Sequence, residues 1–288
     1  MIKDWLWFPT NKCLIDGTWT LPNELNEIEL TNPSDGEFLS FIARSSKTDV
    51  ENAVSSAHEA LNRAWGKKTA VERGRILIKM SKLVLHYGEK LALLESLDVG
   101  KPLSQARTDV TALARYLEFY GGATDKIHGL TIPYENDFLV FGLRERLGVT
   151  AHIIPWNYPM QIIGRSISAS LAMGNACVLK PSEEACLTAL AFGEIAREAG
   201  LPNGALNIIP GFGSEAGQAL ASNERVNHIS FTGSVRTGTL IQTAAAQNIV
   251  ATRLELGGKS PQIVFEDANL GRAIPFLVNA GIQNSGQT

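Results

Sequence analysis

Hydrophobic residues recur at helical spacing through most of the first 125 positions of the chain. Thr48 and Glu51, three residues apart, predict a capping box where the first helix begins. A short strand with an Asp-Gly turn over 13–19 and an apolar run over 38–43 precede it. The section is therefore expected to be mostly helical, and it carries no chemical motif. Its helices are predicted over about 48–65, 69–87, 90–97 and 102–120.

The pattern changes between residues 126 and 147. Two apolar runs, 132–134 and 138–146, flank the polar turn 135–137 and predict an antiparallel ribbon. Two strands alone are marginally stable, so we expect the ribbon to pair with another surface. An exposed strand edge is a natural contact between subunits, and we interpret 126–147 as an oligomerisation ribbon.

From residue 148 to residue 256, strand and helix patterns alternate. This alternation predicts an α/β fold with a parallel sheet and helices on both faces. Ligands bind such sheets at the carboxyl ends of the strands, so the residues after each strand are the candidates for chemistry. The strands are predicted over 149–154, 176–179, 206–209, 226–231 and 249–254, and the helices over 160–173, 188–199, 215–220 and 235–246.

Polar side chains follow the first two of these strands. Asn157 lies in a turn bounded by two prolines, where its amide could donate to a developing oxyanion or could simply cap the next helix. Lys180 and Glu183 could hold the hydroxyls of a ribose, or could form a solvated charged turn.

The other strand ends add glycines, a serine and a carboxylate. The run 211–217 fits G-x-G-x-x-x-G, which is a weak signal for a dinucleotide. Ser234 begins a helix, where it could meet a phosphate or act as the N-cap. Glu255 lies between two leucines, so its charge is either used or solvated at a strand end. Convergence of all these groups on one sheet edge is much less likely by chance than any one of them.

Composition excludes several classes of protein. A chain of 288 residues suggests about two domains, and its net charge of −3 gives no indication of nucleic-acid binding. No apolar run reaches 18 residues, and the first residues lack the pattern of a signal peptide, so no membrane partner is expected. Three cysteines without a C-x-x-C pair and five scattered histidines indicate a reducing, cytoplasmic location and no metal site.

Together the strand-end residues resemble the motifs of the aldehyde dehydrogenase superfamily, of the NAD(P)-dependent, non-phosphorylating kind. The resemblance implies a Rossmann-type sheet, an N-terminal helical section, a protruding β-ribbon and a truncated catalytic domain. The implied division is 1–125 with 148–257 for the helical section and NAD-binding domain, 126–147 for the ribbon, and 258–288 for the start of the catalytic domain. The motifs are Ile154–Pro159, Lys180–Glu183, Phe231–Ser234 with Gly238, Leu254–Pro261 and Asn284–Thr288.

The resemblance also implies roles for single residues. Asn157 would donate to the oxyanion of a thiohemiacetal, and Glu255 would be the general base. Lys180 and Glu183 would hold the adenosine ribose, and Ser234 would contact the pyrophosphate. NAD is expected rather than NADP, because the Glu183 carboxylate would repel a 2′-phosphate. The other residues of the implied cofactor cleft are Ile154, Pro155, Trp156, Ser182, Gly213, Gly217, Phe231, Thr232, Gly233, Leu256 and Gly257.

The nucleophile of the family is a Cys directly after the Gly-Gln-Thr type of motif, which would be position 289 here. Cys13, Cys177 and Cys186 are expected to be small buried residues instead. Two interpretations stay open: the N-terminal part of an enzyme that oxidises a small aldehyde, or a nucleotide-binding, oligomer-forming module without turnover. A CoA-acylating relative ranks lower, since that route can dispense with Glu255 as the base for hydrolysis.

The resemblance further implies a homodimer or homotetramer for the complete protein. Beyond residue 258 we predict a strand over 262–265 and a helix over 270–283. In isolation these elements would leave apolar faces uncovered, and we expect poor solubility.

Overall fold

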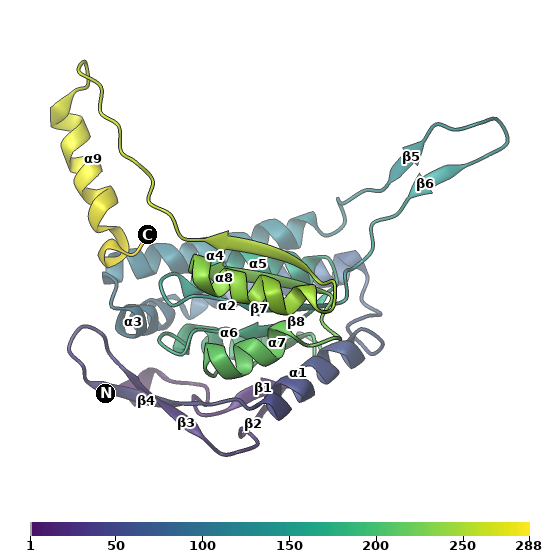
Figure 1. Ribbon diagram of the computed structural model, residues 1–288, viewed down its shortest axis with the longest axis horizontal. Helices are drawn as coiled ribbons and strands as arrows, with labels where there is room; N and C mark the ends of the chain where they lie inside the picture. Colours follow the sequence, from purple (N-terminus) through teal and green to yellow (C-terminus); the bar gives the residue numbers. More distant parts are fainter. Residues whose placement is uncertain (1) are drawn as a thin grey trace.

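The computed structural model describes residues 2–288; Met1, the first residue of the predicted section 1–125, lies outside them. Seven strands of the described chain form one mixed sheet in the order β11-β10-β7-β8-β9-β1-β2 (Figure 1). The predicted parallel sheet is confirmed, and the hairpin β1 (Cys13–Ile15) and β2 (Thr18–Thr20) extends it antiparallel beyond β9. The parallel strands are β7 (Val149–Ile153), β8 (Ala176–Lys180), β9 (Leu206–Ile208), β10 (His228–Gly233) and β11 (Ala251–Leu256).

Helices cover both faces of this sheet, as predicted. One face packs against α5 (Pro159–Ala172) and α6 (Leu187–Ala199), and the other against α1 (Lys47–Ala60), α7 (Gln218–Ala221) and α8 (Val235–Ala246). An outer layer of α2 (Ala70–His86), α3 (Gly88–Val99) and α4 (Leu103–Ala123) covers α5 and α6. In the chain from residue 2 to residue 288, no helix is both long and apolar enough to cross a membrane.

The central strands are buried from end to end. Every residue of β7 and of β8 is buried, as expected for strands covered by helices on both sides. Parallel neighbours need a crossover, and α5 supplies it between these two strands. The loops after the strands therefore reach the surface at one common edge.

The first helix begins earlier than its capping box predicts. Ser46 accepts from the backbone N–H of Asp49, and Asp49 accepts from the N–H of Ser46 at 2.8 Å. The predicted box of Thr48 and Glu51 is therefore wrong, because Thr48 already lies inside α1. Glu51 instead forms an ion pair with Arg225 at 2.7 Å.

Two strands begin and end two residues later than the hydrophobic pattern predicts. The runs 226–231 and 249–254 become β10 and β11, which end at Gly233 and Leu256. Pairing continues as far as Gly233 opposite Leu256, because each strand supplies the other with ladder hydrogen bonds. The predicted helix 215–220 is a π-helical turn over Gly213–Gly217 followed by α7.

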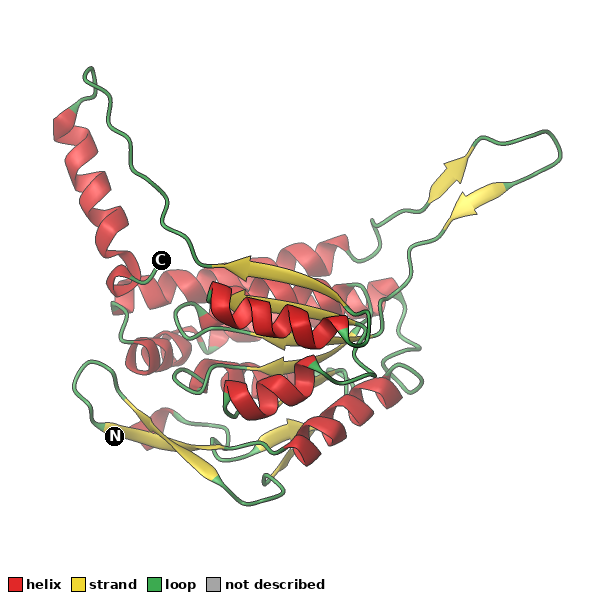
Figure 2. Cartoon of the chain, viewed as in Figure 1, coloured by secondary structure: helices red, strands yellow, loops and turns green. Residues whose placement is uncertain are grey.

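Two segments project from the body of the molecule (Figure 2). The ribbon consists of β5 (Leu130–Ile132) and β6 (Val140–Gly142), which pair only with each other among the described strands. β5 begins two residues earlier than the predicted run 132–134, and β6 is shorter than the predicted run 138–146. The second segment ends in α9 (Leu270–Ile282), close to its predicted bounds, and α9 buries none of its residues. The predicted strand 262–265 is wrong, because this stretch has no neighbouring strand and stays irregular and exposed. The remaining elements are η1 (Ile2–Trp5), the hairpin of β3 (Glu27–Thr31) and β4 (Phe38–Ala43), and the turn η3 (Gln283–Gly286).

Candidate active site

A cleft of about 1750 Å³ opens at the carboxyl ends of β7, β10 and β11. Its walls come from the turn after β7, the start of α8, the end of β11 and the projecting segment from Gly258 to Thr288. The sheet edge thus gathers side chains that are far apart in the sequence, as is usual for a parallel sheet. The predicted site residues that line it are Pro155, Trp156, Asn157, Thr232, Gly233, Ser234, Glu255, Leu256 and Gly257.

Asn157 occupies the turn between β7 and α5 and does not cap the helix. The N-cap is Tyr158, and no side chain caps α5. The Nδ2 of Asn157 instead donates to the carbonyl of Gln287 at 2.8 Å. An amide group carries two N–H donors, so one of them stays available to a ligand in the cleft. The structure therefore excludes the capping alternative.

Glu255 enters the same cleft from the edge strand β11. Its side chain is 43% exposed, and its Oε1 accepts from Arg253 Nε at 3.1 Å. A pair this exposed adds little stability, so it leaves the carboxylate free to take another partner. The carboxylate is partly solvated, and it shares a cleft with Asn157 and Thr288.

Ser234 is the N-cap of α8: its Oγ accepts from the N–H of Thr237 at 3.1 Å. This confirms the structural alternative, and it leaves the helix N-terminus facing the cleft, where backbone N–H groups favour an anion. The preceding Gly233 is required by the protein itself, since an added Cβ would lie 2.5 Å from the Phe231 ring.

Lys180 and Glu183 form a second group, outside the walls of this cleft. The buried Lys180 Nζ lies 2.7 Å from Glu183 Oε2, and Glu183 Oε1 accepts from the N–H of Gly213 at 3.5 Å. Burial opposes the charged carboxylate, but the Lys180 ammonium outweighs burial and lowers the pKa of Glu183. The turn is therefore an ordered, ionised pair and not a freely solvated one.

The other predicted residues contribute little side-chain surface. Ile154 and Phe231 are buried in the core. Ser182 accepts from the N–H of Glu184 at 3.3 Å and so serves its own turn. Gly217 is buried within the π-helical turn. Any contact of these residues with a ligand would have to come mainly from the backbone.

Sequence reasoning missed two residues beside the cleft. Gln105 of α4 donates from Nε2 to the hydroxyl of Tyr158 at 3.2 Å. The same hydroxyl lies 3.2 Å from Thr288 Oγ1. No local pattern marks Gln105, because a single polar residue on a helix is ordinary; Tyr158 had a signal only in its place beside Asn157.

The cysteines are all buried, as expected. Burial raises the pKa of Cys13 to about 12 and that of Cys177 to about 11, and it also raises the pKa of Cys186. A nucleophilic cysteine needs an accessible thiolate. These three thiols therefore do not supply a nucleophile to the cleft.

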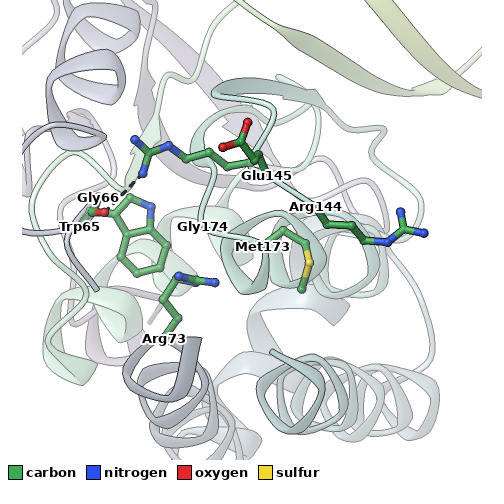
Figure 3. A pocket seen from close by; sticks show the side chains of 8 residues that line it. Trp65, Gly66, Arg73, Arg144, Glu145, Met173 and Gly174 are labelled. Carbon is green, nitrogen blue, oxygen red and sulfur yellow. Dashed lines mark hydrogen bonds between the residues drawn. The ribbon is translucent and has the colours of Figure 1, made fainter. Parts of the chain in front are cut away.

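A second cavity, of about 500 Å³, lies at the amino ends of the strands (Figure 3). Its arginines already bind backbone carbonyls. Arg73 donates to Ala172 at 3.0 Å, and Arg146 donates to Leu61 at 3.1 Å. The positive charges stand at the C-terminal ends of helices, where they stabilise the fold. We therefore assign the candidate site to the other edge of the sheet.

Known proteins are similar to this chain over nearly its whole length. A model described as "Aldehyde dehydrogenase family" matches residues 19–288. Hydroxyisobutyraldehyde dehydrogenase of Mycolicibacterium austroafricanum is 43% identical over 273 residues, which are 95% of this chain and 54% of that protein. The chain thus spans about half the length of the curated relatives it matches.

Solved structures are also similar to this chain in fold and in sequence. The NAD⁺ complex of an aldehyde dehydrogenase from Bacillus cereus has a TM-score of 0.95 and 37% identity, covering 97% of this chain and 57% of that one. An NADP-dependent enzyme of E. coli has a TM-score of 0.95 and 35% identity, covering 99% of this chain and 59% of that one. The two neighbours differ in cofactor, so likeness alone does not choose between NAD and NADP.

Proposed function

The chain belongs to the aldehyde dehydrogenase family, and on that premise we propose that it carries the cofactor-binding part of an enzyme that oxidises an aldehyde to a carboxylic acid with NAD. The observation that supports this most is the shared cleft of Asn157, Ser234, Glu255 and Thr288. It combines an amide donor, a helix N-terminus and a carboxylate at the edge where parallel sheets bind ligands.

The residues present fit a dinucleotide. Glu183 is held by Lys180 and by the N–H of Gly213, so its carboxylate is ready to accept from ribose hydroxyls. A Cβ added at Gly213 would meet nothing within 4 Å, which leaves the surface beside that carboxylate open to a ligand. The N-terminus of α8, at Ser234, would face the pyrophosphate. When bound, NAD would accept the hydride that the aldehyde carbon loses.

The proposed chemistry gives Asn157 and Glu255 one role each. A thiolate from a Cys after Thr288 would attack the aldehyde carbon and form a thiohemiacetal. The free N–H of Asn157 would donate to the resulting oxyanion. Loss of hydride leaves a thioester, and Glu255 would take a proton from the water that hydrolyses it to acid and thiol.

Cofactor binding by the chain itself tests the proposal. We expect NAD to bind saturably in isothermal titration calorimetry and to bind more tightly than NADP. In Glu183→Gln the preference for NAD should fall by roughly tenfold, because the charge that repels a 2′-phosphate is gone. Glu184→Gln is the matched control, since Glu184 is exposed and lies outside the ion pair. Absence of NAD binding to the folded wild type would refute the cofactor assignment.

The alternative function is a nucleotide-binding module without turnover. The three buried thiols favour it for the residues of this chain considered alone. We propose that oxidation requires a protein that continues beyond Thr288, because relatives are about twice as long. Sustained NADH production from an aldehyde by the 288-residue chain would contradict this.

We further propose the division of the chain implied by its motifs. Residues 1–125 with 148–257 would form the helical section and the NAD-binding domain, and 258–288 would begin the catalytic domain. The ribbon 126–147 would join subunits into a homodimer or homotetramer. The exposed apolar side chains of β5, β6 and α9 support this, since such surface is usually covered in the working protein.

A further inference from the structure

The turn that follows α9 has an unusual backbone. Asn284, Ser285 and Gly286 have φ of 51°, 53° and 80° in succession. For residues other than glycine the left-handed region is unfavourable, so surrounding contacts must hold this turn. Such strained segments are often found at functional sites.

Asn284 supplies the contacts that hold the turn. Its side chain is 1% exposed, and its Nδ2 donates to the carbonyl of Asn157 at 2.8 Å and to that of Gln287 at 3.2 Å. The same Gln287 carbonyl accepts from Asn157 Nδ2. Two amide side chains therefore meet at one carbonyl and link the turn after β7 to the segment before Thr288.

Gln105 fastens this junction to the helical layer. Its Oε1 accepts from the backbone N–H of Asn284 at 2.8 Å, and its Nε2 donates to the hydroxyl of Tyr158. The ammonium of Lys101 lies 4.5 Å from the centre of the Tyr158 ring. Lys101 is itself buried in an ion-pair cluster with Glu95 and Asp109. The Tyr158 ring that Gln105 contacts therefore packs against a buried ion-pair cluster.

Asn284 does not line the cleft. Both N–H groups of its amide are engaged by carbonyls, and its Oδ1 is buried without a partner in the described chain. Its effect is on the relative position of Asn157 and Thr288, which lie far apart in the sequence. We propose that Asn284, braced by Gln105, is a positioning residue that sets the distance between Asn157, the proposed oxyanion donor, and Thr288. This inference rests on the proposed function.

Two substitutions in the turn distinguish the contribution of its backbone conformation from that of the Asn284 side chain. Asn284→Gly accepts the left-handed backbone but removes the amide, and Ser285→Gly is the matched control in the same turn. In the full-length protein, kcat of Asn284→Gly should fall roughly 10- to 100-fold, since small misplacements of reacting groups cost about this much. KM for NAD should change less than about twofold, because no hydrogen bond of the described chain joins Asn284 to Lys180, Glu183 or Ser234. Ser285→Gly should stay within about threefold of wild type, since Ser285 Oγ only donates to the Gly100 carbonyl.

A second variant keeps the idea testable if Asn284→Gly does not fold. Gln105→Ala removes the brace and leaves the turn sequence intact. It should lower kcat by roughly threefold to tenfold with KM for NAD unchanged, because one hydrogen bond is worth about 1 kcal/mol. Wild-type kcat in both variants would overturn the positioning role while the proposed function stands.

Hydrogen exchange on the 288-residue chain gives a reading that needs no turnover. The N–H of Asn284 should exchange faster in Gln105→Ala, and the Gln287–Thr288 segment faster in Asn284→Gly. Exchange equal to that of wild type in both variants would overturn the proposal even if the protein oxidises no aldehyde. Failure of wild type to bind NAD or oxidise aldehydes would count against the proposed function instead.

Discussion

Among single residues, burial determines which titratable side chains keep their usual pKa. His152 of β7 is 3% exposed, its Nε2 lies 3.0 Å from Thr150 Oγ1, and its Nδ1 has no partner in the described chain. Burial, and to a smaller extent the nearby His228, lowers the pKa of His152 to about 3. The imidazole is therefore neutral in the folded protein at any pH at which the protein is expected to work.

This shift predicts a loss of stability in mild acid. Between pH 6.5 and about pH 3 the unfolded chain binds a proton at His152 that the folded chain does not, so stability falls as the pH falls. At pH 5 the loss should be about 2 kcal/mol. Urea unfolding at pH 7.5 and pH 5 should show a smaller loss in His152→Gln than in wild type. His58→Gln, at an exposed position, should behave as wild type; the same pH dependence in all three proteins would contradict the prediction.

The burial of Lys180 and its pairing with Glu183 depend on the surrounding structure and not on the residue types alone. A lysine and a glutamate three positions apart are commonly a solvated pair. Here the lysine ends a strand buried on both faces, so its ammonium stays buried and takes Glu183 as partner. Burial excludes a freely solvated turn, and contact of the pair with a ribose stays a prediction.

At the level of elements, the ribbon 126–147 exposes several large apolar side chains. Phe138, Leu139 and Phe141 are each more than half exposed, although large apolar side chains are usually buried. Two strands of three residues each do not form a stable sheet alone. The ribbon therefore needs another surface, which we propose is a second copy of the chain.

Removing these side chains should weaken self-association. We expect the triple variant Phe138→Ser, Leu139→Ser, Phe141→Ser to sediment as a smaller species than wild type in analytical ultracentrifugation. Phe119→Ser is the control, since Phe119 is equally exposed but lies on α4, away from the ribbon. A triple variant that sediments as wild type would show that the ribbon does not mediate assembly.

For the whole molecule, the segment 258–288 stands apart from the core that α1 to α8 enclose. Its apolar side chains, including Ile263, Phe265 and Phe276, face solvent. Such a contiguous apolar surface is rare on an isolated protein and indicates that other protein covers it. The length of the relatives supports a covering by residues beyond Thr288.

The chain alone should therefore bind a hydrophobic dye. We expect strong ANS fluorescence that drops in the double variant Phe276→Ser, Ile282→Ser, because these two α9 side chains are among its most exposed. Leu85→Ser, an exposed apolar position on α2, should leave the signal near the wild-type level. Weak ANS fluorescence of the wild type, with a single cooperative melt at high concentration, would contradict the prediction.

Local patterns carried much of the fold because they depend on neighbours in sequence. The alternating runs after residue 148 predicted the parallel strands and their helices, and the loops after the strands contain most of the predicted residues that line the cleft. The wrong predictions concern segments whose structure depends on a partner strand. The stretch 262–265 has the composition of a strand but no strand to pair with. β10 and β11 end two residues after their apolar runs, because the hydrogen bonds between the two strands continue past those runs.

By itself the sequence determined the α/β class, the family and the chemical types present at the strand ends, since periodicity and motifs are local properties. Only the tertiary structure decided the strand order, the addition of β1 and β2 to the sheet, and the junction of Asn157, Gln287 and Asn284. The Asn157–Gln287 contact joins positions 130 residues apart, and Gln105 reaches Asn284 across 179. Such pairs form because packing of the whole chain brings the backbones together, and no local pattern names the partner.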